Sequence, residues 1–157
     1  MGWLKEETQM KKLISLLVFL SVLSFAQVTD AMLQAIAKVE SNENDLAVNI
    51  SENAVGRYQI RPAYFREIQR ICGLRGKPCT FTLADRQNAT KAREMAEIYL
   101  NYWGEQYRKA TGKAPTAEVY FKIHNGHAFW KRSRTANPTY FANIERYAKK
   151  ASSRMIQ

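Results

Sequence analysis

Glu40 is an acidic residue in a position that would give it unusual chemistry. Apolar side chains precede it by seven, four and three positions, which places the acid on the apolar face of a helix starting after Thr29 or Asp30. Burial and the negative end of the helix dipole both favour the protonated acid. A protonated carboxyl group near neutral pH is what general acid catalysis of glycoside cleavage requires. The alternative is a surface glutamate on a slightly different stripe.

Four short motifs follow one another over roughly residues 30 to 130. The motifs are Glu40-Ser41; Gly56-Arg57-Tyr58-Gln59-Ile60 with Pro62; Leu83-Ala84-Asp85 with Met95-Ala96-Glu97-Ile98-Tyr99-Leu100; and Ile123-His124-Asn125-Gly126. Their order and spacing resemble those of the lytic transglycosylase family, whose fold is lysozyme-like. The chain departs from the family pattern at Arg57-Tyr58, where small or apolar residues are usual, and at His127, where many members have a second glycine.

The resemblance implies roles for individual residues. Glu40 would be the catalytic acid and base, and Gln59 and Asn125 would lie in the cleft beside it. Ser41 and Tyr99, as motif residues, are expected at the substrate site. Tyr58 is expected to stack on a sugar ring, although aromatic residues at this density are more often part of the core.

The reaction implied by the resemblance is cleavage of the β-1,4 bond between N-acetylmuramic acid and N-acetylglucosamine in peptidoglycan strands. Glu40 would protonate the leaving oxygen and then take a proton from the muramoyl C6 hydroxyl, which gives a 1,6-anhydro product. Most glycosidases use two carboxylates, and attack by water would make the enzyme a hydrolytic lysozyme. The candidates for a second carboxylate are Glu43, Asp45, Glu52 and Asp85.

A different class of function is a non-catalytic, cationic protein that binds the cell wall. The formal net charge is +10, and the excess of Lys and Arg lies in the second half, from Arg108 onward. A basic segment of this kind indicates an anionic partner. Nucleic acid is not the expected partner, because no helix-turn-helix or finger motif accompanies the basic residues.

The elements needed to position these residues are mostly helical, so the predicted class is mostly α (α+β) with a small β lobe beside the cleft. The lobe spans Asn42 to Ile60, and an amphipathic helix runs from Pro62 to about Cys72. The longest helix, capped by Asn88 or Asp85, runs to about Ala110. A short helix capped by Thr116 ends at His124, with Asn125-Gly126 as its stop, and a last helix starts near Pro138.

The N-terminus is typical of a secretory signal peptide. Residues 10–26 combine Lys11-Lys12, an apolar run too short to span a membrane comfortably, and Ser24-Phe25-Ala26. We therefore expect a signal peptide over residues 1–26, with Met10 as the natural start, and a catalytic domain over 27–157. The mature protein would be a periplasmic or secreted monomer without a stable membrane span. The sequence leaves open whether it serves a secretion, conjugation or phage machinery, or routine wall turnover.

Cys72 and Cys79 flank a short loop containing Gly and Pro, which predicts a local disulfide in an exported protein. His124 and His127 form a His-x-x-His pair, but no third ligand candidate accompanies them. Neither a metal nor an organic cofactor is expected.

Overall fold

The computed structural model describes residues 27–126 and residue 146. Its elements in chain order are α2 (Asp30–Ser41), β1 (Val48–Asn49), β2 (Ala54–Val55), α3 (Pro62–Leu74), the 3-10 helix η1 (Leu83–Gln87), α4 (Ala89–Thr111) and α5 (Ala117–Gly126). The fold is mostly helical with one small two-stranded sheet, which confirms the predicted class.

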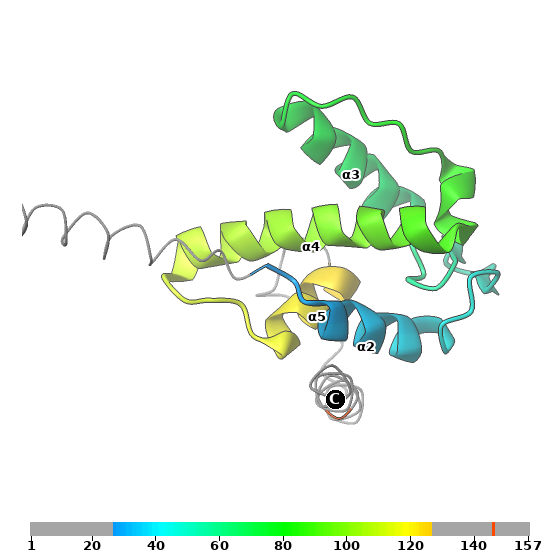
Figure 1. Ribbon diagram of the computed structural model, residues 1–157, viewed down its shortest axis with the longest axis horizontal. Coiled ribbons are helices and arrows are strands. Elements are labelled where there is room, and N and C mark those ends of the chain that lie inside the picture. The colour runs from blue at the N-terminus through cyan, green and yellow to red at the C-terminus, as the bar shows by residue number, and fades with distance from the viewer. Residues whose placement is uncertain (1–26, 127–145, 147–157) are drawn as a thin grey trace, which may run out of the picture.

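Helix α4 is the central element. Figure 1 shows it crossing the molecule, with α3 on one side and α2 and α5 on the other. Its buried residues recur at helical spacing, because one side faces α3 and another faces α2 and α5. They are Ala92, Met95, Ala96, Tyr99, Leu100 and Gly104. The side chain of Asn88 caps its start by accepting from the Lys91 amide at 3.0 Å, and Gly112 ends it at φ 71°.

Helix α2 begins as its capping chemistry predicts. The Thr29 hydroxyl accepts a hydrogen bond from the Met32 amide at 3.3 Å, and Asn42 ends the helix in the left-handed conformation with φ 56°. Apolar residues of this helix are buried against the core, and Glu40 occupies its last turn. The cap and the stripe together aim the Glu40 side chain at the end of the helix bundle nearest the β lobe.

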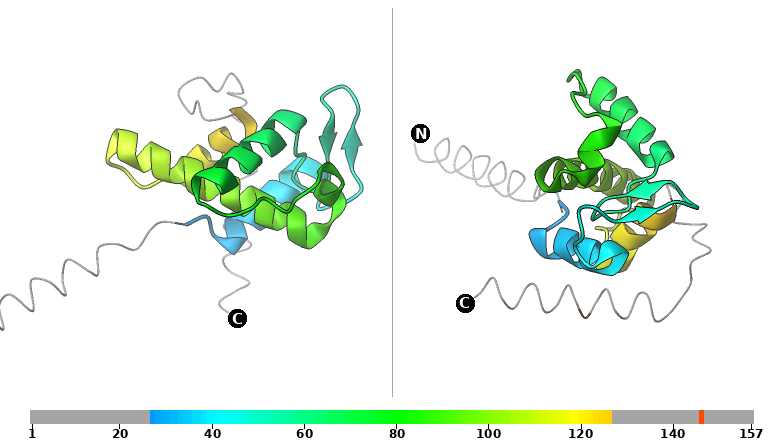
Figure 2. Two further views of the ribbon diagram at one scale, coloured as in Figure 1. Left: turned by 90° about the horizontal axis from the view of Figure 1, so that it is seen from above. Right: turned by 90° about the vertical axis from the view of Figure 1, so that its right-hand side faces the viewer.

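The β lobe is a short hairpin at one end of the bundle (Figure 2). Strands β1 and β2 pair antiparallel, with Val48 opposite Val55 and Asn49 opposite Ala54. Gly56 follows at φ 79°, and a Cβ there would lie 1.8 Å from the carbonyl oxygen of Arg86. Only glycine therefore allows the lobe to approach η1 this closely.

Arg86 joins the same two elements through its side chain. Its guanidinium donates to the carbonyl of Asn53 at 3.1 Å and to that of Ile60 at 3.0 Å, and it also donates to Leu83 within η1 at 2.8 Å. The side chain is buried, and this desolvation lowers the pKa of Arg86. Sequence patterns gave no reason to single out this residue.

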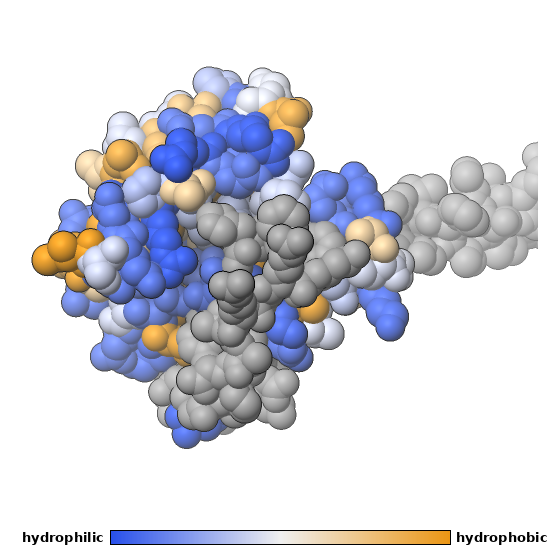
Figure 3. Space-filling view, turned by 180° about the vertical axis from the view of Figure 1, so that it is seen from behind, coloured by the Kyte–Doolittle hydropathy of each residue, from blue (hydrophilic) through white to orange (hydrophobic). Residues whose placement is uncertain are grey.

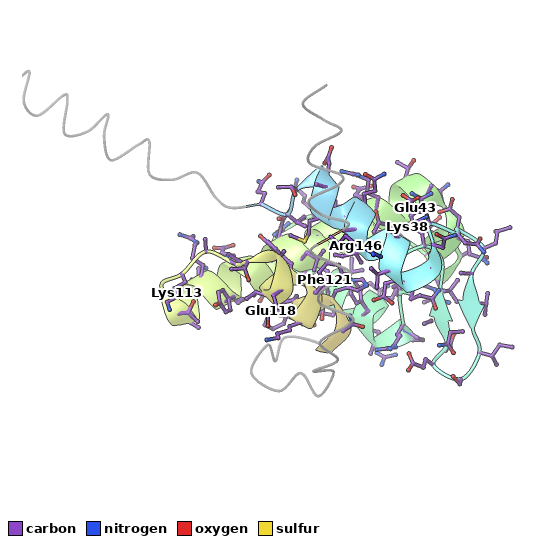
Figure 4. All side chains as sticks on the ribbon, turned by 90° about the horizontal axis from the view of Figure 1, so that it is seen from below. Lys38, Glu43, Lys113, Glu118, Phe121 and Arg146 are labelled. Carbon is purple, nitrogen blue, oxygen red and sulfur yellow. The ribbon has the colours of Figure 1, made fainter. Side chains whose placement is uncertain are left out.

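The part of the described surface that is visible in Figure 3 is mostly hydrophilic, with separated apolar spots. Exposed apolar residues of the β lobe region include Leu46, Val48 and Ile50. Figure 4 shows Phe121 turned into the interior from α5, whereas Glu118 and Lys113 point outward. Within residues 27–126, no helix is both long and apolar enough to cross a membrane.

Two predictions differ from the described structure. Helix α5 continues through Gly126 instead of stopping at His124, so Asn125 is a helical residue. Cys72 and Cys79 are free thiols, not a disulfide. Burial raises the pKa of the Cys72 thiol, and its contact with the Cys79 thiol acts in the same direction, so the two groups are close enough to interact. The signal peptide, His127 and, apart from residue 146, the last predicted helix lie outside the described residues.

Candidate active site

A pocket forms where the end of α2, the β lobe, the start of α3 and the end of α5 meet. Its empty volume is ≈ 330 Å³. The residues that line it are Glu40, Gln59, Arg61, Tyr64, His124 and Asn125. Three predicted site residues, Glu40, Gln59 and Asn125, are thus brought together from three separate elements. Of the described residues that line the pocket, Glu40 alone carries a carboxyl group.

The Glu40 side chain is partly buried at the pocket wall, less completely than its place on the apolar face of α2 predicts. The Asn125 amide Nδ2 donates to Glu40 Oε1 at 3.3 Å. This donor restrains the orientation of the carboxyl group at the pocket wall. The acid is therefore held in a defined position that still has access to a ligand.

Gln59 adopts a backbone conformation that is rare for a residue with a side chain, with φ 46°. Its side-chain Nε2 donates to the carbonyl of Gly56 at 2.9 Å. Left-handed backbone at a non-glycine residue costs free energy and is concentrated at functional sites. The conformation turns Gln59 toward the pocket, while Tyr58 and Ile60 on either side of it are buried.

Ser41 contributes to the site by joining two elements. Its hydroxyl donates to the carbonyl of Arg57 at 2.9 Å and accepts from the Asn44 amide at 3.0 Å. The contact ties the end of α2 to the β lobe, so it fixes the lobe relative to Glu40. The structure does not place Ser41 among the residues that line the pocket.

Two aromatic residues predicted to contact substrate belong to the core instead. Tyr58 is 2% exposed and Tyr99 is 1% exposed, so neither ring is available to a sugar in this structure. Burial raises the pKa of both hydroxyls. The Tyr99 ring stacks on Tyr64, with centroids 3.7 Å apart, so Tyr99 lies directly behind a residue of the pocket. Tyr58 approaches the site through its backbone carbonyl.

Sequence reasoning missed the roles of His124 and Tyr64. His124 Nε2 lies 3.0 Å from the Tyr58 carbonyl oxygen, and His124 Nδ1 lies 3.3 Å from the Tyr64 hydroxyl. Both ring nitrogens are therefore engaged in hydrogen bonds and neither is available to a metal. Burial lowers the pKa of His124 below its usual value of 6.5, while the Glu40 charge and the Tyr58 bond act in the opposite direction. A motif of adjacent His and Asn was visible in the sequence, but the partners of the histidine were not.

The four other carboxylates named from the sequence have separate environments. Asp45 accepts from Arg57, and this hydrogen bond lowers the pKa of Asp45. Asp85 forms a capping box with Thr82 and pairs with Lys91 at 2.8 Å. Glu43 follows the end of α2, and Figure 4 shows it close to Lys38.

Glu52 differs from these three because its partner belongs to the pocket. It accepts from Arg61, which lines the pocket with Glu40. Glu52 itself is not among the lining residues.

A second, larger pocket of ≈ 450 Å³ lies away from these residues, along the C-terminal half of α4. Its lining includes Arg75, Glu105 and Arg108. None of the predicted catalytic or substrate-contacting residues lines it. We therefore place the candidate active site at Glu40.

A protein-family model matches most of the chain. The family described as "Transglycosylase SLT domain" matches residues 23–141, which include every residue that lines the Glu40 pocket. Comparison with curated proteins gives no match.

Proposed function

We propose that Glu40 is the catalytic acid and base of a peptidoglycan lytic transglycosylase. The proposal starts from the family: the chain belongs to the SLT transglycosylase family. Members of this family are lytic transglycosylases that act on peptidoglycan. The observation that carries the proposal for this chain is the presence of Glu40 as the one carboxyl group among the described residues that line the pocket.

A single carboxyl group favours a route in which the substrate supplies the nucleophile. Glu40 first donates its proton to the leaving glycosidic oxygen, so the bond to the N-acetylglucosamine unit breaks. The acetamido group of the muramoyl unit stabilises the anomeric carbon. The Glu40 carboxylate then takes the proton of the muramoyl C6 hydroxyl, whose oxygen bonds to the anomeric carbon. The product is a 1,6-anhydro sugar, and Glu40 regains its proton.

Asn125 and Gln59, which line the pocket with Glu40, support this reaction. The Asn125 donor at 3.3 Å stabilises the Glu40 carboxylate that forms after the first proton transfer. The side-chain amide of Gln59 has both donors and an acceptor, which suits the hydroxyl and acetamido groups of a sugar.

A hydrolytic lysozyme is the second candidate, and the ion pair between Arg61 and Glu52 favours it. The contact brings a second carboxylate to the edge of the Glu40 pocket, where it could activate water or stabilise the anomeric carbon. Glu52→Gln would then abolish cleavage, whereas Arg61→Gln, which breaks the same ion pair, would retain a larger share of it. Equal effects of the two substitutions would show that Glu52 acts only as the ion-pair partner of Arg61.

Mass spectrometry of digested cell-wall sacculi separates these outcomes. We expect anhydromuramoyl products from the wild type. Products with reducing ends would establish the lysozyme instead. The absence of cleavage products would favour a non-catalytic wall-binding protein and would refute the proposed activity.

We further propose that the chain is exported with cleavage after Ala26. N-terminal sequencing of exported protein should begin at Gln27. A secretion, conjugation or phage machinery that needs a local opening in the wall is the kind of partner that fits.

A further inference from the structure

The hydrogen bonds of His124 define the protonation state of its ring. The ring is 8% exposed. A carbonyl oxygen only accepts hydrogen bonds, so Nε2, at 3.0 Å from the Tyr58 carbonyl, must carry the proton. In the neutral ring Nδ1 is then an acceptor, and the Tyr64 hydroxyl donates to it at 3.3 Å. His124 thus joins two segments that are 66 and 60 residues away from it in the chain.

Tyr64 extends this connection to the central helix. Its ring stacks on Tyr99 of α4 at 3.7 Å, with an interplanar angle of 21°, and meets the His124 ring edge-on at 5.4 Å. Burial raises the pKa of the Tyr64 hydroxyl well above its usual value, which keeps the hydroxyl protonated and able to donate. The start of α3, the middle of α4 and the end of α5 are therefore fixed to one another at this point.

The immediate chain neighbours of these residues carry the proposed chemistry. Asn125, next to His124, donates to Glu40 at 3.3 Å. Gln59, next to Tyr58, faces the pocket at φ 46°. One imidazole ring thus connects the segment that carries Asn125 to the segment that carries Gln59.

We propose that His124 and Tyr64 are positioning residues for the reaction at Glu40. Held by the Tyr58 carbonyl, they set the distance between Gln59 on the β lobe and Asn125 on α5. This inference rests on the proposed function of Glu40, because it assigns a role in that reaction. A displacement of about 1 Å in catalytic geometry can lower a rate by about 100-fold, so such a role should be visible in kcat.

The competing explanation is that both residues only stabilise the fold. Removal of the Tyr64 hydroxyl would then act like removal of any buried tyrosine hydroxyl, with a loss of stability and no loss of activity per folded molecule. Tyr120 provides the matched control. It is a buried tyrosine on α5, 3% exposed, and it packs on Gly104 near the second pocket, away from Glu40.

The experiment compares Tyr64→Phe, His124→Phe and Tyr120→Phe. Each variant is assayed on soluble glycan strands at a temperature well below the melting temperature of that variant. We expect kcat to fall about 10-fold for Tyr64→Phe and about 100-fold for His124→Phe, with KM within about twofold of the wild type. Tyr120→Phe should keep kcat within about twofold. His124→Gln retains a donor for Tyr58 and an acceptor for Tyr64, so it should recover part of the activity lost in His124→Phe.

Unchanged kcat in Tyr64→Phe and His124→Phe would overturn the inference, as would an equal loss in Tyr120→Phe. Failure of the proposed function has a different signature, namely a wild type that does not cleave the strands. The positioning role is then decided by nitrogen-15 NMR. We expect the tautomer protonated at Nε2 of His124 and a shift of the Gln59 amide in Tyr64→Phe but not in Tyr120→Phe. A ring protonated at Nδ1, or an unshifted Gln59, would refute it.

Discussion

At the scale of the residue, the role of Glu40 depends on polar contacts that come from distant parts of the chain. Asn125, 85 residues away, supplies a donor to one of its oxygens, and Gln59 faces it across the pocket. A partly buried carboxyl group that lines a pocket and is oriented by a side-chain donor is suited to donate a proton and recover it. Substitution of the acid separates catalysis from binding.

Glu40→Gln preserves size but removes the exchangeable proton. General acid or base catalysis is typically worth about 100- to 10,000-fold in rate, so we expect cleavage of sacculi to fall by at least that range. Binding to sacculi in a pelleting assay should persist, because Gln59 and Arg61 remain. Glu97→Gln is the matched control, since Glu97 is a 40% exposed side chain on α4 whose ion pair with Arg93 is 4.0 Å long. Near wild-type cleavage by Glu40→Gln would assign the acid elsewhere.

His124 gives the folded state a dependence on pH. Burial lowers the pKa of His124 from its usual 6.5, so the unfolded chain takes up this proton at a higher pH than the folded chain does. The stabilisation is complete above pH 6.5 and decreases as the pH falls below it. The groups that face the ring are the Glu40 carboxylate, the Arg61 guanidinium, the Tyr64 hydroxyl and the Tyr58 carbonyl.

Chemical denaturation at a series of pH values measures this effect. We expect the free energy of unfolding to decrease as the pH falls below 6.5, and His124→Phe should flatten that part of the curve. The contribution of Asp85 to the free energy of unfolding changes at a lower pH, because hydrogen bonds from Lys91 and Thr82 lower the pKa of Asp85 to about 2. An equally steep curve in His124→Phe would assign the dependence to other groups.

The sequence predicted the motif residues of the site better than its aromatic residues. Glu40, Gln59 and Asn125 meet in one pocket, whereas Tyr58 and Tyr99 are buried. Residues 56–59 form a turn, so the alternation of a strand does not apply there and could not predict that Tyr58 is buried. The contacts of His124 and Arg86 were not predictable, because they join positions that are 26 to 66 residues apart.

At the scale of the element, helix starts were predictable because their signals are local. Thr29 and Asn88 cap the predicted helices, and Pro62 occupies the first position of α3. The placement of the β lobe was not predictable, since it depends on the close approach of Gly56 to the Arg86 backbone. That approach provides a test of how the lobe is attached.

Gly56→Ala should destabilise the protein, because its Cβ would lie 1.8 Å from the Arg86 carbonyl oxygen and its φ of 79° is strained for alanine. We expect a loss of about 2 to 4 kcal/mol in the free energy of unfolding. Gly73→Ala is the control, because nothing lies within 4 Å of the new Cβ and the position is in α3. It should stabilise the helix by about 0.5 to 1 kcal/mol. A Gly56→Ala protein as stable as the wild type would show that the lobe can move away from η1.

At the scale of the whole molecule, charge is distributed unevenly. The net charge of the chain is +10, yet Lys and Arg balance Asp and Glu over residues 27–107, with ten of each kind. Residues 108–157 hold eleven Lys and Arg against two Asp and Glu. Peptidoglycan-bearing surfaces are anionic, so residues 108–157 would increase the local concentration of enzyme at its substrate without contributing to the chemistry.

Neutralisation of Lys131, Arg132 and Arg134 by Gln should therefore weaken binding to sacculi while leaving kcat on soluble glycan strands unchanged. Binding is measured in proteins that also carry Glu40→Gln, so that cleavage of the sacculi does not disturb it. The kcat is measured without that substitution. The control neutralises Arg66, Arg75 and Lys77, three exposed cations of the balanced half, and removes the same formal charge. Because screening shortens the range of electrostatic attraction from about 8 Å at 0.15 M salt to about 3 Å at 1 M, the difference between the two triple variants should be largest at low salt and vanish at high salt. Equal weakening by both variants would show that net charge alone, and not its concentration in the second half, attracts the protein to the wall.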